Sequence, residues 1–368
     1  MGSSVIIYFT MYIFTIVLAM IYNKKLLQKR FSRKLWFLLL LVPPIFLGTF
    51  RYNVGTDYNS YIRLYHILSG YSFSQYISTI TTNVLYQEPL WFLLNKISFI
   101  FFSDETAIFF LSSLITMLFV ILGIRNFAKD VPIGYALFIF FMVQYNMSFN
   151  AIRTLIAASI IFFALKYIYQ KKIWKYLFAI ILAAGFHKTA FIAILFYLVV
   201  PIGNKDLNRV KKFLYYLLIL LTPIVLLVGL EIAKFIPIFD KYFYKYDIQS
   251  LNFGIGFLLY VLPFLVPILI QRTKIIRLDK NYSSLVDIAL FHIPLRYMGY
   301  FTEYGHRLEV YISIVYIILI PLTIKSASKN ISKILLFSYY SLVLLGYYIF
   351  IYIYTLGHGT YPYFFNIG

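Results

Sequence analysis

The sequence predicts an all-α, polytopic integral membrane protein with about 10–12 transmembrane or re-entrant helices. Three observations support this fold class. Hydrophobic residues make up 62% of the 368 residues and charged residues only 12%, and the mean hydropathy of +0.82 is far above that of soluble domains. Apolar runs long enough to cross about 30 Å of hydrocarbon recur from end to end. The Lys and Arg residues behind the net charge of +20 cluster in short loops between these runs.

The basic loops orient the chain, because cytoplasmic loops of membrane proteins are enriched in Lys and Arg. The positive charge therefore indicates which loops face the cytoplasm, and we expect no nucleic-acid partner. If every basic loop is cytoplasmic, both termini and the loops at about 51–88 and 231–253 face outward, and residues 1–368 form a single polytopic membrane domain. The basic loops are 24–34, 125–129, 166–175, 205–212, 272–280 and 325–333.

Ten segments are expected to cross the bilayer. The first lacks a basic leading region and a small-residue cleavage site, so we expect it to be retained as a helix. The others follow from the alternation of apolar runs and basic loops. The expected crossings are 4–22, 35–50, 106–124, 131–146, 151–169, 213–230, 254–271, 284–302, 308–324 and 334–355.

Two apolar stretches are expected not to cross. Residues 89–103 are short and contain Asn95 and Lys96, and the alternation fails if they span. Residues 174–201 are expected to enter and return on the cytoplasmic side as a hairpin. Its two pieces have about 13 residues each, or about 20 Å of helix, which is too short for a crossing. The turn of this hairpin is 185–188.

Polar and charged residues gather at the expected outer boundaries of the spans. Such residues at a membrane boundary are costly unless they are paired or used. The outer face is therefore the candidate functional face. Its residues are Arg51, Asp57, Arg153, His187, Glu303, His306, Arg307 and Glu309.

Residues 57–68 are expected to form a helix lying on the membrane surface. Aromatic and aliphatic residues recur there at positions i, i+3, i+4 and i+7, which gives the helix one apolar face. Thr56 or Asp57 is expected to cap its start, and the helix N-terminus with Arg51 nearby would attract an anion. The residues of the apolar face are Tyr58, Tyr61, Ile62 and Tyr65.

Each feature also has a structural interpretation. Interfacial tyrosines anchor many membrane proteins, Arg153 can extend to the headgroups, and a single His such as His187 is more often structural than catalytic. His292 and Arg296, one helical turn apart, could pair, line a cavity or only pack, and Asp287 could reach the inner interface. The combination on one face carries more weight than any single residue.

Missing motifs exclude several chemistries. The chain has no cysteine, which excludes disulfides and thiol catalysis. It also has no zinc-ligand spacing, HExxH, Walker loop, GxSxG elbow or Asp-x-Asp pair. We therefore expect no cofactor, and a donor substrate would bring its own leaving group.

The motifs resemble those of the EpsG family of bacterial polysaccharide polymerases, a Wzy-like group, over nearly the whole chain. Arg51 to Tyr61 are similar to R-x-x-x-G-x-D-Y-x-x-Y, and Ala183 to Ala190 to A-x-x-F-H-x-[ST]-A. The 150–157 and 307–321 segments are also similar, although Thr154 stands where the family usually has Gln after Arg. Pro362-Tyr363 is a further, less specific similarity.

The resemblance implies a GT-C-like glycosyltransferase that polymerises undecaprenyl-pyrophosphate-linked repeat units of O-antigen, capsule or exopolysaccharide at the outer face of the cytoplasmic (inner) membrane. The implied partners are that lipid-linked glycan and the bilayer, and a chain-length regulator is a candidate. Two alternatives remain open. A lipid-linked glycan flippase would line a path through the bilayer with its charges, and a membrane acyltransferase would place its His near a donor entry, often cytoplasmic.

In such a polymerase, departure of the pyrophosphate requires cations, and the acceptor hydroxyl requires a general base. Because Arg can neutralise the leaving group, no metal is required. The resemblance implies His187 and Asp57 as competing bases, Arg51, Arg153 and Arg307 as pyrophosphate ligands, and Tyr58 and Tyr61 as substrate contacts.

Overall fold

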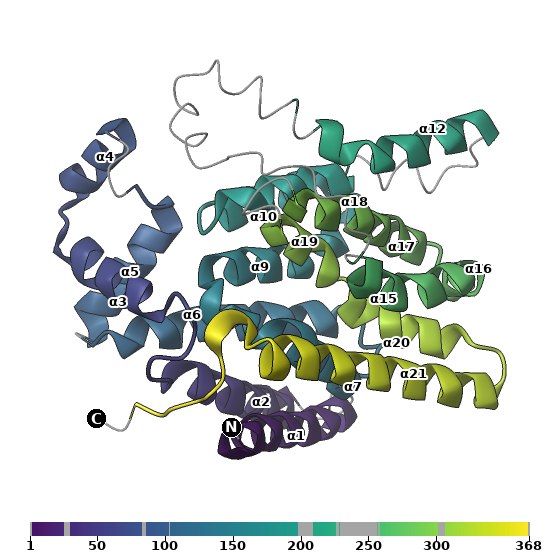
Figure 1. Cartoon of the computed structure of the whole chain (residues 1–368), viewed down its shortest axis with the longest axis horizontal. Coiled ribbons are helices and arrows are strands. Elements are labelled where there is room, and N and C mark those ends of the chain that lie inside the picture. Colours follow the sequence, from purple (N-terminus) through teal and green to yellow (C-terminus); the bar gives the residue numbers. More distant parts are fainter. Residues whose placement is uncertain are drawn as a thin grey trace. The chain divides into compact units, whose positions relative to one another are not determined.

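The computed structural model describes residues 2–25, 30–82, 86–102, 104–197, 209–225, 258–300 and 306–366, together with Val228 and Gly256. The described residues are helical almost throughout (Figure 1) and include no strand, only an isolated bridge between Arg51 and Phe365. This confirms the all-α polytopic fold class. The outer loop expected at 231–253 lies outside the described residues.

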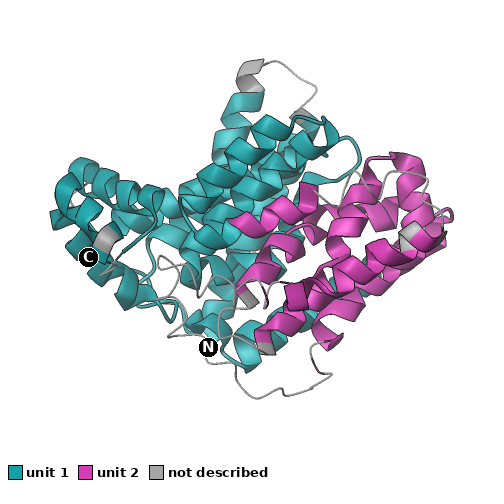
Figure 2. Ribbon diagram, turned by 90° about the horizontal axis from the view of Figure 1, so that it is seen from above, with its two compact units in different colours: residues 1–190, 337–368 teal, residues 191–336 magenta. Residues whose placement is uncertain are grey.

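The chain divides into two compact units (Figure 2). Unit 1 comprises residues 1–190 and 337–368, and unit 2 comprises residues 191–336. The helices of unit 1 are α1 (Gly2–Lys25), α2 (Arg30–Thr49), α3 (Tyr58–Gly70), α4 (Phe73–Thr82), α5 (Pro89–Phe102), α6 (Thr106–Arg125), α7 (Ile133–Phe140), the π-helix η1 (Phe141–Tyr145), α8 (Met147–Asn150), α9 (Ile152–Tyr169), α10 (Ile173–Ala184), α21 (Asn330–Tyr348) from residue 337 onward, η5 (Ile349–Tyr354) and η6 (Gly357–Gly359).

Unit 2 is built from shorter helices. The 3₁₀ helix η2 (Lys188–Ala193) contains the last residues of unit 1 and the first residues of unit 2. The other helices are α12 (Arg209–Leu220), α15 (Leu258–Ile270), α16 (Arg272–Leu278), α17 (Tyr282–Leu290), α18 (His292–Tyr297), η4 (Met298–Tyr300), α19 (His306–Ser313) and α20 (Tyr316–Ser326).

Among the described residues, five helices are long and apolar enough to cross a membrane, or six if the bent pair α15 and α16 forms one span. The protein is therefore multi-pass. α15, the helix described within the expected span 254–271, meets α16 at 62° where that span ends. The expected span 284–302 is interrupted, because its described residues divide among α17, α18 and η4. Pro294 in α18 explains the break after α17, because it lacks the N–H that would bond the carbonyl of Leu290.

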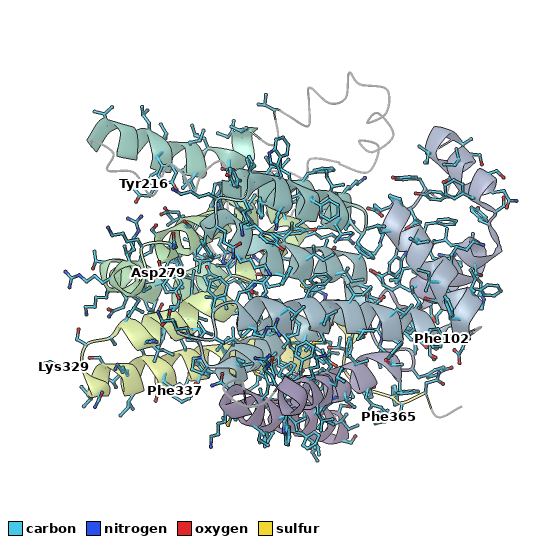
Figure 3. The ribbon with its side chains drawn as sticks, turned by 180° about the vertical axis from the view of Figure 1, so that it is seen from behind. Phe102, Tyr216, Asp279, Lys329, Phe337 and Phe365 are labelled. Carbon is cyan, nitrogen blue, oxygen red and sulfur yellow. The ribbon has the colours of Figure 1, made fainter. Side chains whose placement is uncertain are left out.

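The long helices of unit 1 alternate in direction between two ends. At one end, here called the polar end, the Arg51 guanidinium after α2 lies 4.4 Å from the ring centre of Phe109 near the start of α6. At the other, the basic end, the Arg125 guanidinium that closes α6 lies 5.9 Å from the ring of Phe37 near the start of α2. Figure 3 shows Phe102 and Phe365 toward one end and Phe337 toward the other. This alternation agrees with the order predicted from the basic loops.

α10 forms the first half of the predicted hairpin, and α9 before it corresponds to the predicted crossing 151–169. At the basic end, Tyr169 at the end of α9 contacts Phe127, with ring centres 5.7 Å apart. α10 returns to the polar end, where the carbonyl of Gly185 accepts from the N–H groups of Leu90 (2.8 Å) and Trp91 (3.3 Å). With 12 residues, or about 18 Å, α10 is too short for a full crossing. The return half is described only to residue 197.

α5 has both ends near the polar end, which agrees with the prediction that residues 89–103 do not cross. Its first turn bonds Gly185, and the ring of Phe102 at its end lies 6.0 Å from that of Phe110 in α6. The Nζ of Lys96 donates to the carbonyl of Ser69 at 2.5 Å, so the lysine in this apolar helix is paired inside the protein.

The aromatic face of α3 is buried against protein, which corrects the prediction that the helix lies on the membrane surface with this face toward lipid. Tyr58 and Tyr61 are 4% and 6% exposed. Tyr58 stacks on Phe109 with ring centres 5.0 Å apart, and Tyr61 meets Trp91 at 5.6 Å. The helical period was predicted correctly, but its apolar face packs on α5 and α6.

The outer surface of α1 fits a bilayer. Ile6, Ile13 and Met20, seven residues apart, are 68%, 61% and 57% exposed. A repeated row of large exposed apolar side chains would promote aggregation in water, whereas lipid solvates it.

The C-terminal residues return to the polar end of unit 1 and pair with the segment after α2. The N–H of Tyr52 donates to the carbonyl of Phe364 (2.9 Å), and the N–H of Gly55 donates to the carbonyl of Gly359 (2.8 Å). The segment after α2 is therefore held from both sides, by the C-terminal residues and by the helices that follow it.

In unit 2, buried polar residues pair differently from the sequence-based expectation. His292 and Arg296 do not pair with each other, and Asp287 is 0% exposed and ion-paired, so it does not extend to an interface. The pairs are His292 Nδ1 with Tyr316 Oη (2.8 Å), Arg296 Nη1 with Glu309 Oε1 (2.6 Å) and Arg272 Nη2 with Asp287 Oδ1 (2.9 Å).

Gly55→Ala is predicted to destabilise the folded protein by about 1–2 kcal/mol or more. Gly55 has φ +104°, and an added Cβ would lie 2.9 Å from the carbonyl oxygen of Phe149. Thermal unfolding in detergent measures the effect. Gly346→Ala is the matched control, because its Cβ would meet nothing within 4 Å. Equal unfolding temperatures for the two variants would contradict the tight approach at Gly55.

Candidate functional site

A buried carboxylate lies at the centre of the candidate site. Glu88 is 6% exposed, and its two oxygens are held by different helices. Oε2 accepts from Nη1 of Arg153 at 2.7 Å. Oε1 lies 3.0 Å from Nδ1 of His187 and 3.4 Å from the backbone N–H of Lys188. This contact set joins the segment before α5, the start of α9 and the turn after α10.

The local sequence explains why Glu88 is held here. Pro89 occupies the first position of α5, where no N–H is needed, and the carbonyl of Glu88 accepts the helical bond from Phe92 at 2.9 Å. The next N–H groups of α5 bond the carbonyl of Gly185. Gly185 permits this approach, because a Cβ there would lie 2.6 Å from Cγ of Leu90. The turn that carries His187 is therefore docked on the start of α5.

Arg153 lies in the first turn of α9, just after an interruption of the helical conformation at Ala151. Ala151 between α8 and α9 has φ −91° and ψ 52°, which is not helical. Nη1 of Arg153 donates to both Glu88 and Oε1 of Gln87 (2.8 Å). The other guanidinium nitrogens make no hydrogen bond to the described residues, and 23% of the side chain is exposed. Arg153 can therefore hold Glu88 and still donate to a ligand.

The charges of the cluster favour an anionic Glu88. Burial by itself would raise the pKa of this carboxyl, but the hydrogen bond from His187 and the charge of Arg153 outweigh it and lower the pKa to about 2. Burial lowers the pKa of the half-buried Lys188 ammonium to about 8, although Glu88 opposes that shift. One carboxylate thus faces two cationic side chains and a histidine, so the site carries excess positive charge.

The proton on His187 can be assigned from its partner. An ionised carboxylate only accepts hydrogen bonds, so Nδ1 of His187 must carry the proton shared with Glu88. In the neutral ring, Nε2 is then the basic nitrogen. This arrangement gives His187 one defined tautomer.

Asn150 organises a second polar cluster beside the first. Its Oδ1 accepts from the hydroxyl of Thr56 (2.6 Å) and the N–H of Asp57 (2.8 Å), while its carbonyl accepts from the hydroxyl of Tyr61 (2.8 Å). Its Nδ2 lies 3.3 Å from Nδ1 of His358. Asn150, and not Thr56 or Asp57 as predicted, therefore satisfies the start of α3; the Asp57 side chain makes no capping bond.

Apart from Arg51, the structure places the predicted residues of unit 1 in three settings. Arg153 and His187 meet at Glu88. Asp57 is half-buried beside Asn150, with its carboxylate making no hydrogen bond to the described residues. Tyr58 and Tyr61 are packed in the protein.

Arg51 is enclosed by protein. It is 1% exposed, its Nη1 donates to the carbonyl of Phe149 at 2.7 Å, and its guanidinium lies over the rings of Phe109 and Phe149. Burial lowers the pKa of Arg51 to about 10, so it stays charged at neutral pH. These contacts favour a packing role over direct contact with a pyrophosphate.

Arg307 belongs to unit 2, where it is half-buried at the start of α19. Its proposed part in pyrophosphate binding therefore stays a prediction. The described residues include no group of three or more His, Asp or Glu side chains able to hold a metal ion.

No role was predicted from the sequence for Glu88, Lys188 or Asn150. The signal for Glu88 was present, because an acidic residue directly before Pro89 and an apolar run is as costly at a membrane boundary as Arg51. Asn150 and Lys188 lie inside matched motifs, but nothing in their spacing identifies their partners.

One protein-family profile matches the chain. The EpsG family profile matches residues 34–365, a range that contains every residue of both polar clusters. No curated protein and no solved structure matches the chain significantly. The matched range covers nearly the whole chain, so the protein belongs to the EpsG family, a Wzy-like family of polysaccharide polymerases.

Proposed function

We propose that the protein polymerises undecaprenyl-pyrophosphate-linked oligosaccharide repeat units at the outer face of the cytoplasmic membrane, with the Glu88 cluster as its catalytic centre. The observation that carries the proposal is the pairing of a buried carboxylate with His187 on one side and Arg153 on the other. A positioned base and adjacent cations are what transfer from a pyrophosphate leaving group to a hydroxyl requires.

In the proposed reaction, Nε2 of His187 takes the proton of the acceptor sugar hydroxyl. The hydroxyl oxygen forms a bond to the anomeric carbon of the donor, the bond from that carbon to the pyrophosphate oxygen breaks, and the lipid pyrophosphate leaves as an anion. Glu88 keeps His187 in the required tautomer and stabilises the imidazolium that forms, as the third group of a catalytic triad does.

Arg153 and Lys188 are the proposed ligands of the departing pyrophosphate. Nη1 of Arg153 bonds Glu88, and the ammonium of Lys188 interacts electrostatically with the same carboxylate. The guanidinium of Arg153 offers a planar fork that matches phosphate oxygens. Asp57 beside Asn150 is proposed to anchor the acceptor sugar, and Tyr61 holds the backbone at Asn150. Arg307 is kept as a candidate pyrophosphate ligand, whereas Arg51, Tyr58 and Tyr61 would support the site by packing.

Deletion of the gene is predicted to leave lipid carriers that bear a single repeat unit and no long polymer. A polymerase defect leaves export intact, so the single-unit species should still reach the cell surface. Gel analysis of surface and lipid-linked glycans measures both. Loss of the single-unit species from the surface would favour a flippase instead.

His187→Ala is predicted to slow polymerisation by about 10²- to 10⁴-fold, the usual contribution of a positioned general base. The assay is polymer formation by purified protein in vesicles, with protein abundance measured in parallel. His66→Ala is the matched control, because the side chain of His66 is 63% exposed and pairs with Glu105 away from the Glu88 cluster. Equal rates for the two variants would exclude His187 as the base.

Arg153→Lys is predicted to slow polymerisation by about a hundredfold, since a lysine keeps the charge but not the planar fork. Arg63→Lys on the exposed side of α3 is the control. If Arg153 only extended to the headgroups, lysine would replace it without loss. Normal polymer length with Arg153→Lys would therefore contradict its assignment.

Alkaline pH is predicted to weaken donor binding. The ammonium of Lys188, with its pKa lowered to about 8, is charged below that pH and loses its charge above it. KM for the lipid-linked donor should rise as pH passes 8, and Lys188→Arg should move this rise to higher pH. An unchanged alkaline limb in Lys188→Arg would show that another group produces it.

A further inference from the structure

An apolar groove runs along the outside of unit 1 between α6, α9 and α10. It has a volume of about 470 Å³, within the range of ligand sites. α9 contributes Ile160, Phe163 and Tyr167, and α10 contributes one face of its helix from Lys175 to Leu182. Trp174 at the rim is 80% exposed.

The groove begins at the basic end, where cations gather around it. Lys175 lines it directly. The Nζ of Lys166 lies 3.6 Å from the ring centre of Phe163, a wall residue, and 5.1 Å from that of Tyr167. Arg125 and Lys175 act on Lys166 electrostatically, and both are positive. An anionic group here would relieve a repulsion that the protein itself contains.

The shape and the charge together specify an amphipathic ligand. From Lys175 to Leu182 the groove follows α10 for about 10 Å, and its wall is almost entirely apolar beyond the lysine. A hydrocarbon chain fits the apolar part and a phosphate fits the cationic mouth. A polyprenyl pyrophosphate held at Glu88 would have the reverse polarity, with its charge at the other end of α10.

We propose that this groove binds an anionic phospholipid of the bilayer, with its phosphate between Lys166 and Lys175 and an acyl chain along α10. Basic pockets between membrane helices bind anionic headgroups by this charge complementarity. The site lies outside the Glu88 cluster, so it does not depend on the proposed polymerase reaction. α10 ends one turn before His187, so the bound lipid would brace the helix that carries the base.

Fluorescence quenching of Trp174 tests the proposal. The full-length protein is placed in phosphatidylcholine vesicles that contain a small fraction of brominated phosphatidylglycerol or brominated phosphatidylcholine. Subtracting the signal of Trp174→Phe isolates the groove tryptophan. Brominated phosphatidylglycerol is expected to quench at lower membrane fractions than brominated phosphatidylcholine.

Charge variants identify the binding groups. Lys166→Gln and Lys175→Gln are each expected to reduce the preference for phosphatidylglycerol by about fivefold. Replacing both by Arg should retain the preference, which shows that loss of folding is not the cause. Lys24→Gln combined with Lys34→Gln removes two exposed charges from α1 and α2, neither of which lines the groove, and should leave the preference unchanged.

Two results would overturn the proposal. Equal quenching by both brominated lipids in the unmodified protein would show that the groove holds any hydrocarbon chain. Equal loss of preference in the Lys24 and Lys34 control would show that general surface charge, and not the groove, attracts the anionic lipid.

Discussion

The architecture around the site depends on the burial of the Glu88 carboxylate. A buried charge is tolerated only when other groups compensate for its lost hydration. Here the compensation comes from Arg153 on α9 and from His187 and Lys188 in the turn after α10. Removing Arg153 or His187 would leave the buried charge of Glu88 only partly compensated. The cluster therefore fixes the ends of three helices relative to one another and gives His187 its orientation.

The break between α8 and α9 joins this cluster to the second one. Before the break, the side chain of Asn150 accepts from the N–H of Asp57 at the start of α3 and contacts His358. After the break, the side chain of Arg153 donates to Glu88. The π-helix η1 precedes the break, and π-turns inside helices frequently occur at functional sites. A continuous helix through Ala151 would rotate Asn150 and Arg153 relative to each other and separate the two clusters.

Sequence features that depend on local chemistry were predictable. The positive loops predicted the alternation of helix directions in unit 1, and the length of residues 89–103 predicted a helix that does not cross. The 57–68 periodicity located α3, but periodicity identifies an apolar face without showing whether lipid or protein covers it. In the structure that face packs on Phe109 and Trp91.

The rest depended on pairings between distant residues. Glu88 is 65 residues from Arg153 and 99 from His187 in the sequence, and no spacing rule joins them. For the same reason the sequence could not separate Arg51, which packs on two phenylalanines, from Arg153, which keeps donors for a ligand. Both are arginines at a helix boundary at the polar end, and only their partners differ.

A double-mutant cycle tests most directly whether Glu88 acts through His187. Polymerisation rates are measured for Glu88→Gln, His187→Ala and the double variant at matched protein levels. Groups that act as one unit are strongly non-additive. If Glu88 acts through His187, Glu88→Gln should slow polymerisation far less when His187 is already absent. Independent, multiplying losses would contradict a carboxylate that positions the base.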